Sequence, residues 1–258
     1  MEIPKIGLGT WNLGGNECVS VVENAIKIGY RHIDTAQMYG NEKEVGIGIK
    51  NSEIDRNKLF ITTKLCFPNT TYDLVISGVK NSLHNLQLDY LDLVLIHEPY
   101  ASSIEMYKAL EDLQTNGLIK HIGVSNFNRK QIDNLLNNCS TTPYVNQIEN
   151  RIFYQREKYV KHLQSKGTKV VAWSPLCADI NKITNNQTIR EIAQKYNKTP
   201  AQIALKFLLE RDIYIIPKSR NPKRLQENLN LDFTIDNNDM NKLKNLDEGR
   251  SLFGWYSD

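Results

Sequence analysis

Short, strongly apolar segments alternate along the chain with longer segments whose apolar residues recur at helical spacing. Most of the short segments are rich in Val, Ile and Leu, with no alternation of apolar and polar residues. Continuous apolar character is typical of strands that are buried on both faces of a parallel sheet. The pattern predicts strands at Arg31–Thr35, Leu59–Leu65, Leu91–His97, Lys120–Ser125, Tyr144–Ile148, Lys169–Trp173, Ile213–Pro217 and Leu231–Phe233.

The segments between these strands carry helix signals. Leu74–Leu88 places Leu and Val residues on one side of a helix, with Leu74 among them, and a helix over Ile104–Leu113 is predicted to end at Asn116-Gly117. Thr199-Pro200 and Asn221-Pro222 each combine a capping residue with proline at the first helical position. Helices are therefore expected to begin at these two prolines.

The number of strand–helix units in the chain predicts the fold. Eight strand–helix units with no Pro-, Gly- or Ser-rich linker between them favour a (β/α)₈ TIM barrel that forms one domain over residues 1–258. The alternative is a doubly wound open sheet, which usually carries a GxGxxG turn after its first strand. Neither Gly7-Leu8-Gly9 nor Gly46-Ile47-Gly48 completes that motif.

Composition narrows the class of protein. The chain has 258 residues and a formal net charge of +3, too balanced for a dedicated nucleic-acid binder. No apolar run approaches the ~20 residues that span a bilayer, so no membrane association is expected. The first residues, MEIPKIGLGT, lack the pattern of a signal peptide. The four cysteines form no CxxC pair, and we expect free thiols in a reducing cytoplasm.

Polar and aromatic side chains recur at the carboxyl ends of the predicted strands. In a barrel this rim carries the active site. The residues at the rim are Asp34 and Tyr39 after the first predicted strand, Lys64 on the second, His97 on the third, Ser125 and Asn126 on the fourth, Gln147 on the fifth, Trp173 and Ser174 on the sixth, and Lys218 and Ser219 on the seventh.

Four of these residues form a chemical unit. A buried lysine is costly unless a carboxylate pairs with it, and Asp34 on the neighbouring strand is the expected partner of Lys64. A Lys⁺ beside a phenol favours the phenolate, so Lys64 is expected to lower the pKa of Tyr39 from ~10 toward the working pH. Tyr39 would then donate a proton to a carbonyl oxygen that gains negative charge, and His97 would donate a hydrogen bond to the same oxygen.

Seven segments in this order resemble the aldo-keto reductase superfamily over Gly7 to Arg250: GYRHIDTAQMYGNEKEVG, ITTKL, YLDLVLIH, GLIKHIGVSNF, NQIE, VVAWSPL and IPKSRNPKRLQEN. The resemblance, which points to its bacterial diketogluconate and aldose reductase-like branch, implies a TIM barrel that binds NADPH without a Rossmann fold. It implies Tyr39 as general acid, Asp34 and Lys64 as the residues that tune it, and His97 as the residue that positions the carbonyl. Hydride would pass directly from the nicotinamide to the carbonyl carbon, and no metal would be required.

The resemblance also implies cofactor contacts. Ser125, Asn126 and Gln147 match the residues that hold the carboxamide, and Trp173 stands where an aromatic ring, more often Tyr, stacks on the nicotinamide. The other matched positions are Thr10 and Trp11, Ser174 and Leu176 near the pyrophosphate, Lys218, Ser219, Arg220 and Arg224 near the 2′-phosphate, and Glu227 and Asn228 near the adenine. Apart from the resemblance, the three cations Lys218, Arg220 and Arg224 near a helix N-terminus are suited to binding an anion such as the 2′-phosphate. This favours NADP(H) over NAD(H).

The chain departs from the family pattern in its substrate pocket, for which we predict Trp11, Tyr39, Phe67, His97 and Glu98. Where the family commonly has Trp-Pro after the histidine, this chain has Glu98-Pro99, and bulky hydrophobic carbonyls are expected to fit less well. Both ends and the Trp173–Thr188 connection are short, which predicts an open pocket. Trp255 and Tyr256 are expected either to plug the barrel edge or to reach the substrate.

The combined prediction is a monomeric, cytoplasmic, NADPH-dependent reductase of a small carbonyl compound. An alternative on the same barrel is an NADPH-binding sensor or regulatory protein in which turnover is incidental. A structural protein recruited from an enzyme would show damage among the four catalytic residues, and the sequence shows none.

Overall fold

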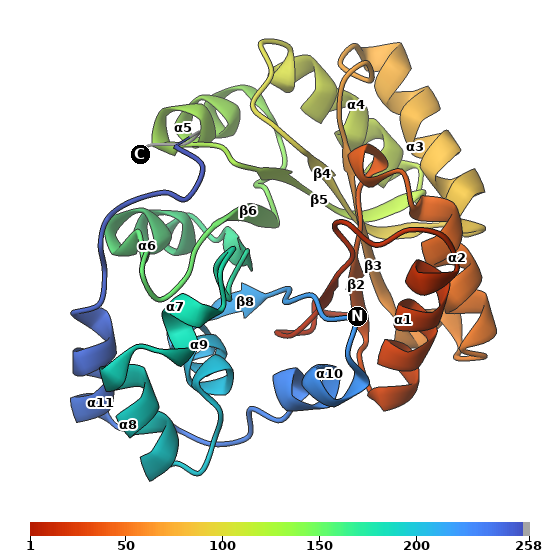
Figure 1. Cartoon of the computed structure of the whole chain (residues 1–258). Helices are drawn as coiled ribbons and strands as arrows, with labels where there is room; N and C mark the ends of the chain where they lie inside the picture. Colours follow the sequence, from red (N-terminus) through yellow and green to blue (C-terminus); the bar gives the residue numbers. More distant parts are fainter. Residues whose placement is uncertain (255–258) are drawn as a thin grey trace.

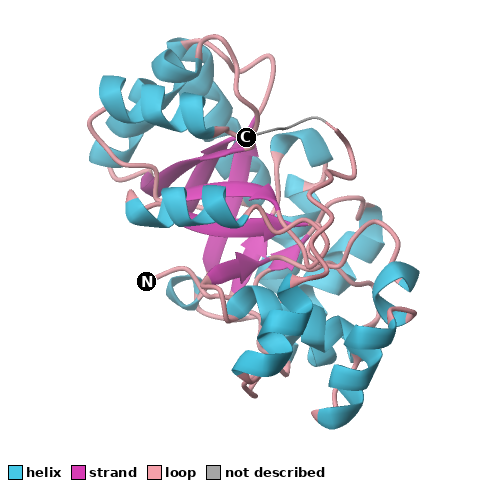
Figure 2. Cartoon of the chain, turned by 90° about the vertical axis from the view of Figure 1, so that its left-hand side faces the viewer, coloured by secondary structure: helices cyan, strands magenta, loops and turns pink. Residues whose placement is uncertain are grey.

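The computed structural model describes residues 1–254 of the chain. Within that range, parallel strands form a curled inner sheet and helices pack around its outside (Figures 1 and 2). The strands are β1 (Leu8–Gly9), β2 (His32–Asp34), β3 (Phe60–Leu65), β4 (Leu91–Ile96), β5 (Ile119–Ser125), β6 (Val145–Glu149), β7 (Lys169–Trp173) and β8 (Ile213–Ile215).

Helices follow the strands, and several begin at the residues that the sequence marks. Thr199 caps α9 in a reciprocal capping box with Gln202, and the Asn221 side chain accepts from two backbone amides of α10. The α-helices are α1 (Gly15–Ile28), α2 (Glu42–Asn51), α3 (Tyr72–Leu86), α4 (Ser103–Thr115), α5 (Arg129–Asn138), α6 (Glu157–Ser165), α7 (Asn181–Thr184), α8 (Gln187–Lys195), α9 (Pro200–Leu209), α10 (Pro222–Leu229) and α11 (Asn237–Lys244), and two 3₁₀ turns are η1 (Gln37–Tyr39) and η2 (Arg56–Lys58).

The strands pair in sequence order from β1 to β8, and every pair is parallel. The first and last strands are linked as well. Ile6 forms a parallel bridge with Ile215, and the Gly7 amide donates to the Ile215 carbonyl at 2.8 Å. This arrangement agrees with the predicted (β/α)₈ barrel and brings the carboxyl ends of all eight strands to one rim.

Two predictions about the strands are wrong. Leu231–Phe233 is not a strand: it follows α10 in tight turns, and Phe233 packs on Tyr196 beside α8 with ring centroids 5.9 Å apart. The strand that the pattern missed is β1, because a two-residue segment between glycines is too short to show a period. Leu74 also differs from expectation, since it lies on the outer face of α3 and is 42% exposed.

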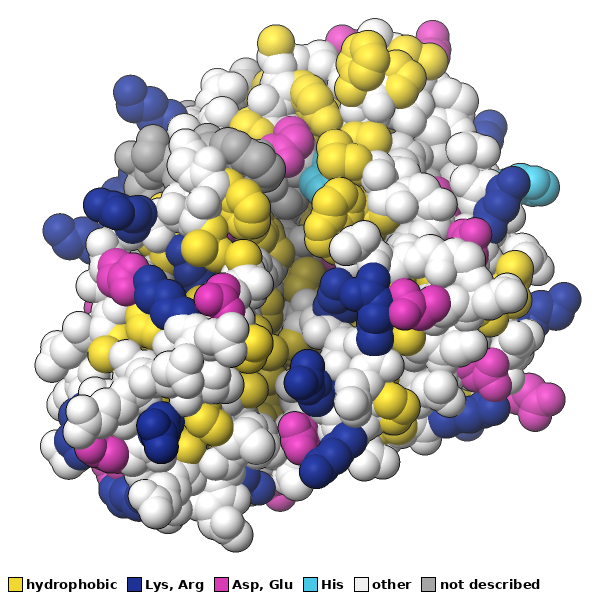
Figure 3. Space-filling view, viewed as in Figure 1, with side chains coloured by type: hydrophobic (Ala, Val, Ile, Leu, Met, Phe, Trp, Pro, Cys, Tyr) yellow, Lys and Arg dark blue, Asp and Glu magenta, His cyan; other side chains and the backbone are white. Residues whose placement is uncertain are grey.

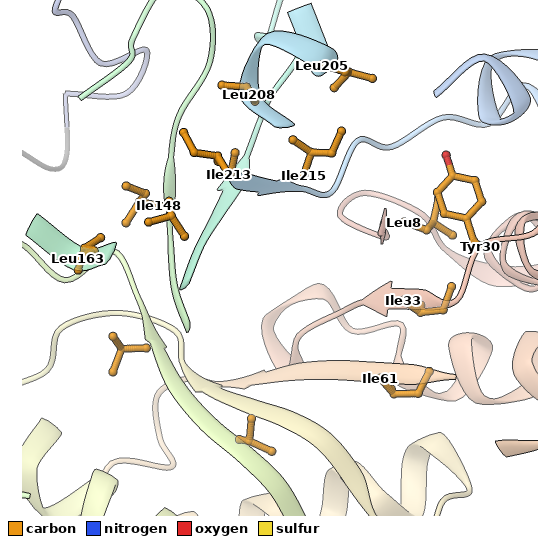
Figure 4. Close-up of a cluster of buried hydrophobic side chains, with 14 of the residues drawn as sticks. Leu8, Tyr30, Ile33, Ile61, Ile148, Leu163, Leu205, Leu208, Ile213 and Ile215 are labelled. Atoms are coloured by element: carbon orange, nitrogen blue, oxygen red, sulfur yellow. The ribbon is translucent and has the colours of Figure 1, made fainter. Parts of the chain in front are cut away.

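The apolar side chains form two layers. The larger layer fills the space between the sheet and the surrounding helices. Figure 4 shows part of it, with Ile213 and Ile215 of β8 beside Leu205 and Leu208 of α9, and with Leu8 and Ile33 near Tyr30. A smaller cluster lies inside the barrel and includes Phe60, Leu93, Leu95, Val145, Val171, Tyr214 and Ile216, with Ile3 from the N-terminal segment. The strands are therefore packed on both faces, and this packing fixes the positions of the strand ends at the rim.

In residues 1–254, the helices are too short or too polar to cross a bilayer.

Candidate active site

The predicted rim residues lie at the carboxyl ends of consecutive strands. Asp34 ends β2, Lys64 is the penultimate residue of β3, and His97 directly follows β4. Tyr39 lies in the η1 turn that follows β2 and returns over the rim. Residues far apart in the sequence therefore meet at one end of the sheet, as the predicted (β/α)₈ barrel requires.

The Lys64 ammonium is the centre of the site. It has no exposed surface, and its three possible donors are used: Nζ lies 2.5 Å from Asp34 Oδ1, 2.9 Å from the Thr35 carbonyl oxygen and 3.1 Å from the Tyr39 hydroxyl oxygen. The carboxylate balances the buried charge, and the hydroxyl of Tyr39 accepts from Lys64. Its own proton is thus left for a partner on the open side.

The pKa of Tyr39 departs from the expectation. Burial of the ring raises the pKa of the Tyr39 hydroxyl above its usual range, and the nearby Lys64 ammonium only opposes that rise. Asp34 and Glu98 add to the rise because their negative charges disfavour a phenolate. The predicted lowering toward working pH is therefore wrong. Tyr39 is held as a protonated phenol, which is the form that a proton donor requires.

His97 stands beside the tyrosine. The two ring centroids are 5.8 Å apart in an edge-to-face arrangement. Burial, together with the nearby positive charge of the Lys64 ammonium, lowers the pKa of His97 to about 3. The imidazole is therefore neutral at physiological pH and carries a single N–H that can be donated to an oxygen atom at the mouth.

The predicted carboxamide-binding residues are hydrogen-bonded to each other, to Asp34 and to Trp173. Gln147 Nε2 donates to Asp34 Oδ2 at 2.7 Å, and Ser125 Oγ donates to the Gln147 carbonyl at 3.0 Å. Asn126 accepts from the Trp173 indole N–H at 2.8 Å. These contacts fix the amide side chains, and the Trp173 ring, at the same part of the rim.

The four predicted phosphate-binding residues follow β8 but do not all converge. Arg220 turns toward the loop after β1, where it pairs with Glu17 at 2.7 Å and donates to the Asn12 carbonyl. Burial lowers the pKa of Lys218, and the charge of Arg220 adds to this effect. Arg224 is exposed on the first turn of α10. Ser219, in the segment that leads into this helix, is buried.

The remaining predicted cofactor contacts differ in exposure. Thr10 is fully buried and its hydroxyl donates to the Asp34 carbonyl at 2.9 Å, so its side chain supports the strand end. Asn228 is buried beside Tyr30, whereas Glu227 is partly exposed on α10. Ser174 and Leu176 are partly buried in the loop after β7.

Apolar side chains surround the mouth. Trp11 is 57% exposed and contacts Tyr39 with ring centroids 4.9 Å apart, while Phe67 is 76% exposed after β3. Figure 3 shows a long groove on this face of the molecule, with hydrophobic side chains along its walls and Lys and Arg side chains on both sides. Such a surface is suited to a ligand with flat rings and negative charge.

Glu98 places a carboxylate at the same mouth. Asn126 Nδ2 lies 3.3 Å from Glu98 Oε1 and 3.4 Å from the His97 carbonyl oxygen. Asn126 thereby connects Glu98 to Trp173. This connection was not predicted, because nothing in the local sequence around Glu98 indicates that it meets the residue after β5.

Two further supports of the site were missed. Asn41 donates to the carbonyls of Thr10 and Leu13 and accepts from Thr35, which ties the Tyr39 turn to the loop after β1. Glu149, at the end of β6, accepts hydrogen bonds from the C-terminal segment. A weak signal for the second support was the position of Glu149 in NQIE, two residues after Gln147. Trp255 and Tyr256 lie outside the described residues.

Comparison with known proteins gives concordant matches. The model for the "Aldo/keto reductase family" matches residues 5–248. Methylglyoxal reductase DkgA of Escherichia coli (strain K12) is 38% identical over 255 residues, covering 97% of this chain and 92% of that protein. Glyoxal reductase of Bacillus subtilis (strain 168) is 39% identical, covering 96% of this chain and 90% of that protein.

A solved structure is similarly close. The aldo-keto reductase MGS-M4, from a Medee basin deep-sea metagenome library, superposes with a TM-score of 0.97 at 39% sequence identity. The superposition covers 100% of this chain and 96% of that chain.

Proposed function

Since this chain belongs to the aldo/keto reductase family, we propose that it reduces a small aldehyde or ketone to the alcohol, with NADPH as hydride donor and Tyr39 as general acid. The observation that carries the proposal is the contact of 3.1 Å between the buried Lys64 ammonium and the Tyr39 hydroxyl, with Asp34 on the other side of the ammonium. Membership of the family supports carbonyl reduction with a nicotinamide cofactor.

The residues of the chain divide the work at the carbonyl oxygen. Neutral His97 donates a hydrogen bond that orients the carbonyl toward the tyrosine. As negative charge develops on that oxygen, Tyr39 gives up its proton to it. The ammonium of Lys64 then stabilises the charge left on the phenol oxygen, because it is already in contact with that atom and needs no reorganisation.

The rim residues fit a nicotinamide cofactor. Asn126 and Gln147 offer amide donors and acceptors suited to a carboxamide, and Trp173 offers a partly exposed ring. Lys218 and Arg224 offer cations beside the start of α10 for a 2′-phosphate, which supports NADP(H) rather than NAD(H). When bound, the cofactor supplies the hydride.

The mouth favours small carbonyl compounds. Trp11 and Phe67 provide apolar walls, whereas Glu98 adds a hydrogen-bond acceptor where an apolar wall would suit a bulky ring. A compact polar carbonyl, such as methylglyoxal or glyoxal, meets both surfaces. The names of the two bacterial relatives agree with this substrate class.

The proposal is tested by following NADPH oxidation with methylglyoxal, glyoxal, aromatic aldehydes and sugars. We expect turnover with the small dicarbonyls and a loss of about 10²- to 10⁴-fold in kcat for Tyr39→Phe. The matched control is Tyr107→Phe, because Tyr107 is buried in α4 and its hydroxyl has no hydrogen-bond partner within residues 1–254. Full activity in Tyr39→Phe would refute the proton-donor role. NADPH binding without turnover on the whole panel would favour the sensor alternative.

A further inference from the structure

A buried carboxylate lies at the rim outside the proposed catalytic group. Glu149 has no exposed surface. It pairs with Arg151, and it accepts from Ser251 Oγ at 2.5 Å and from the Leu252 amide at 2.8 Å. Arg151 in turn donates through Nη2 to the Arg250 carbonyl at 2.9 Å. The two side chains of this ion pair therefore hold three consecutive residues of the C-terminal segment.

The position of this anchor in the sheet relates it to the proposed cofactor site. Glu149 pairs in register with Trp173 across β6 and β7. It also lies two residues after Gln147, so both side chains leave the same face of the strand. The anchored segment then places the Phe253 ring against the Trp173 ring, with centroids 5.5 Å apart and planes inclined by 47°.

We propose that Glu149 is a positioning residue, which anchors the C-terminal segment so that Phe253 braces Trp173 for stacking on the nicotinamide. This inference rests on the proposed function for the role of Trp173. The indole is then held at two points, by its N–H on Asn126 and by Phe253 on its ring. A ring held in place before binding costs less entropy to order when the cofactor arrives.

Anchoring and burial depend on each other. A carboxylate without exposed surface needs donors for both oxygens, and Arg151 supplies only part of that requirement. The C-terminal segment supplies the rest through Ser251 and Leu252. Release of the segment would leave Glu149 short of donors, so the docked arrangement is favoured over the released one.

The first test follows the segment itself. Trypsin cleaves after Arg250, whose carbonyl is held by Arg151. Glu149→Gln keeps the shape of the side chain and removes its charge, and we expect trypsin to remove residues 251–258 at least 10-fold faster than from the wild type, as measured by mass spectrometry. The control is Asp92→Asn, because Asp92 also accepts from an arginine, Arg56, and a backbone amide, but near the start of β4 at the opposite end of the barrel. An unchanged cleavage rate in Glu149→Gln would overturn the anchoring role.

The second test measures the dissociation constant of NADPH by fluorescence titration. We expect Glu149→Gln and Phe253→Ala each to raise it about 5- to 10-fold, and Asp92→Asn to leave it unchanged. Because both residues act through Trp173, the double variant should bind no more weakly than Glu149→Gln alone. Effects that multiply in the double variant would overturn the inference. Phe253 is 40% exposed, so its replacement does not threaten folding, and unchanged binding in Phe253→Ala would overturn the inference as well.

The two proposals fail in different ways. If Tyr39→Phe abolishes turnover while Glu149→Gln and Phe253→Ala bind NADPH like the wild type, the reductase assignment stands and the positioning role is refuted. If the wild type binds NADPH but reduces no carbonyl, and the double variant shows the shared effect, the positioning role stands and the reductase assignment is refuted.

Discussion

Replacement of Lys64 by methionine tests the centre of the site. Methionine keeps a long unbranched side chain in the barrel but removes the ammonium that contacts Asp34, the Thr35 carbonyl and Tyr39. The proposed mechanism uses only the third contact during the reaction. We therefore expect Lys64→Met to slow reduction specifically through Tyr39.

The expected magnitude follows from that contact. A hydrogen bond to a charged group contributes about 1.5–3 kcal/mol, which corresponds to about a 10- to 150-fold decrease in kcat. Alcohol oxidation should suffer more, because it starts from the phenolate. Since Lys64 lowers the pKa of Tyr39 against the effect of burial, its removal raises that pKa further and moves the onset of oxidation to higher pH.

Stability must be separated from catalysis in this experiment. Removing one partner of a buried ion pair costs about 3–5 kcal/mol, a large share of the about 5–15 kcal/mol that stabilises a typical domain. The companion variant Asp34→Asn/Lys64→Met removes the uncompensated carboxylate, and urea unfolding of both variants shows which one is folded under assay conditions.

The assay compares the initial rate of NADPH oxidation by methylglyoxal in four proteins: wild type, Lys64→Met, Tyr39→Phe and the double variant Tyr39→Phe/Lys64→Met. If Lys64 acts through the tyrosine hydroxyl, its replacement has little further effect once that hydroxyl is gone. A Lys64→Met effect of equal size in the Tyr39→Phe background would refute the reasoning.

Three other outcomes follow from the structure. Burial lowers the pKa of His32 to about 4, so the stabilising effect of the neutral imidazole is complete above the unfolded pKa of ~6.5 and is lost as the pH falls toward 4. The free energy of unfolding, measured in urea, should be about 2 kcal/mol lower at pH 5 than at pH 7 because of this group. In His32→Asn the free energy of unfolding should change less between these two pH values. Glu98→Trp should raise kcat/KM for aromatic aldehydes relative to methylglyoxal, and an unchanged ratio would contradict the role given to Glu98 in the pocket. Arg224→Ala should raise the KM for NADPH about 10-fold, a modest effect for an exposed cation, and leave the KM for NADH nearly unchanged; equal effects on both would argue against a 2′-phosphate contact.

Much of the fold could be predicted because its elements have strong local signals. Buried parallel strands such as Leu91–Ile96 are apolar at nearly every position, and Thr199-Pro200 is a capping signal that needs no tertiary context. The two errors come from segments where local pattern and tertiary contact disagree. Leu8–Gly9 is a strand because both β2 and β8 lie beside it, whereas Leu231–Phe233 is apolar because it packs on helices.

The candidate site could be predicted as far as strand ends determine it. The pairing of Lys64 with Asp34 follows from neighbouring strands and the cost of a buried charge. The pKa of Tyr39 could not be predicted in the same way, because its direction depends on how deeply the ring is buried as well as on its neighbour. The contacts of Asn126 with Glu98 and Trp173, and of Glu149 with Ser251, join residues separated by 28, 47 and 102 positions, and no local pattern marks such pairs.

The enclosure of Lys64 also makes it a chemical reporter. Surface lysines such as Lys161 react with amine-directed reagents in the native protein, but the amine of Lys64 has no exposed surface. Its acylation requires the carboxyl end of the barrel to open. The rate at which Lys64 becomes labelled would therefore measure the opening of this one region in a protein that is otherwise folded.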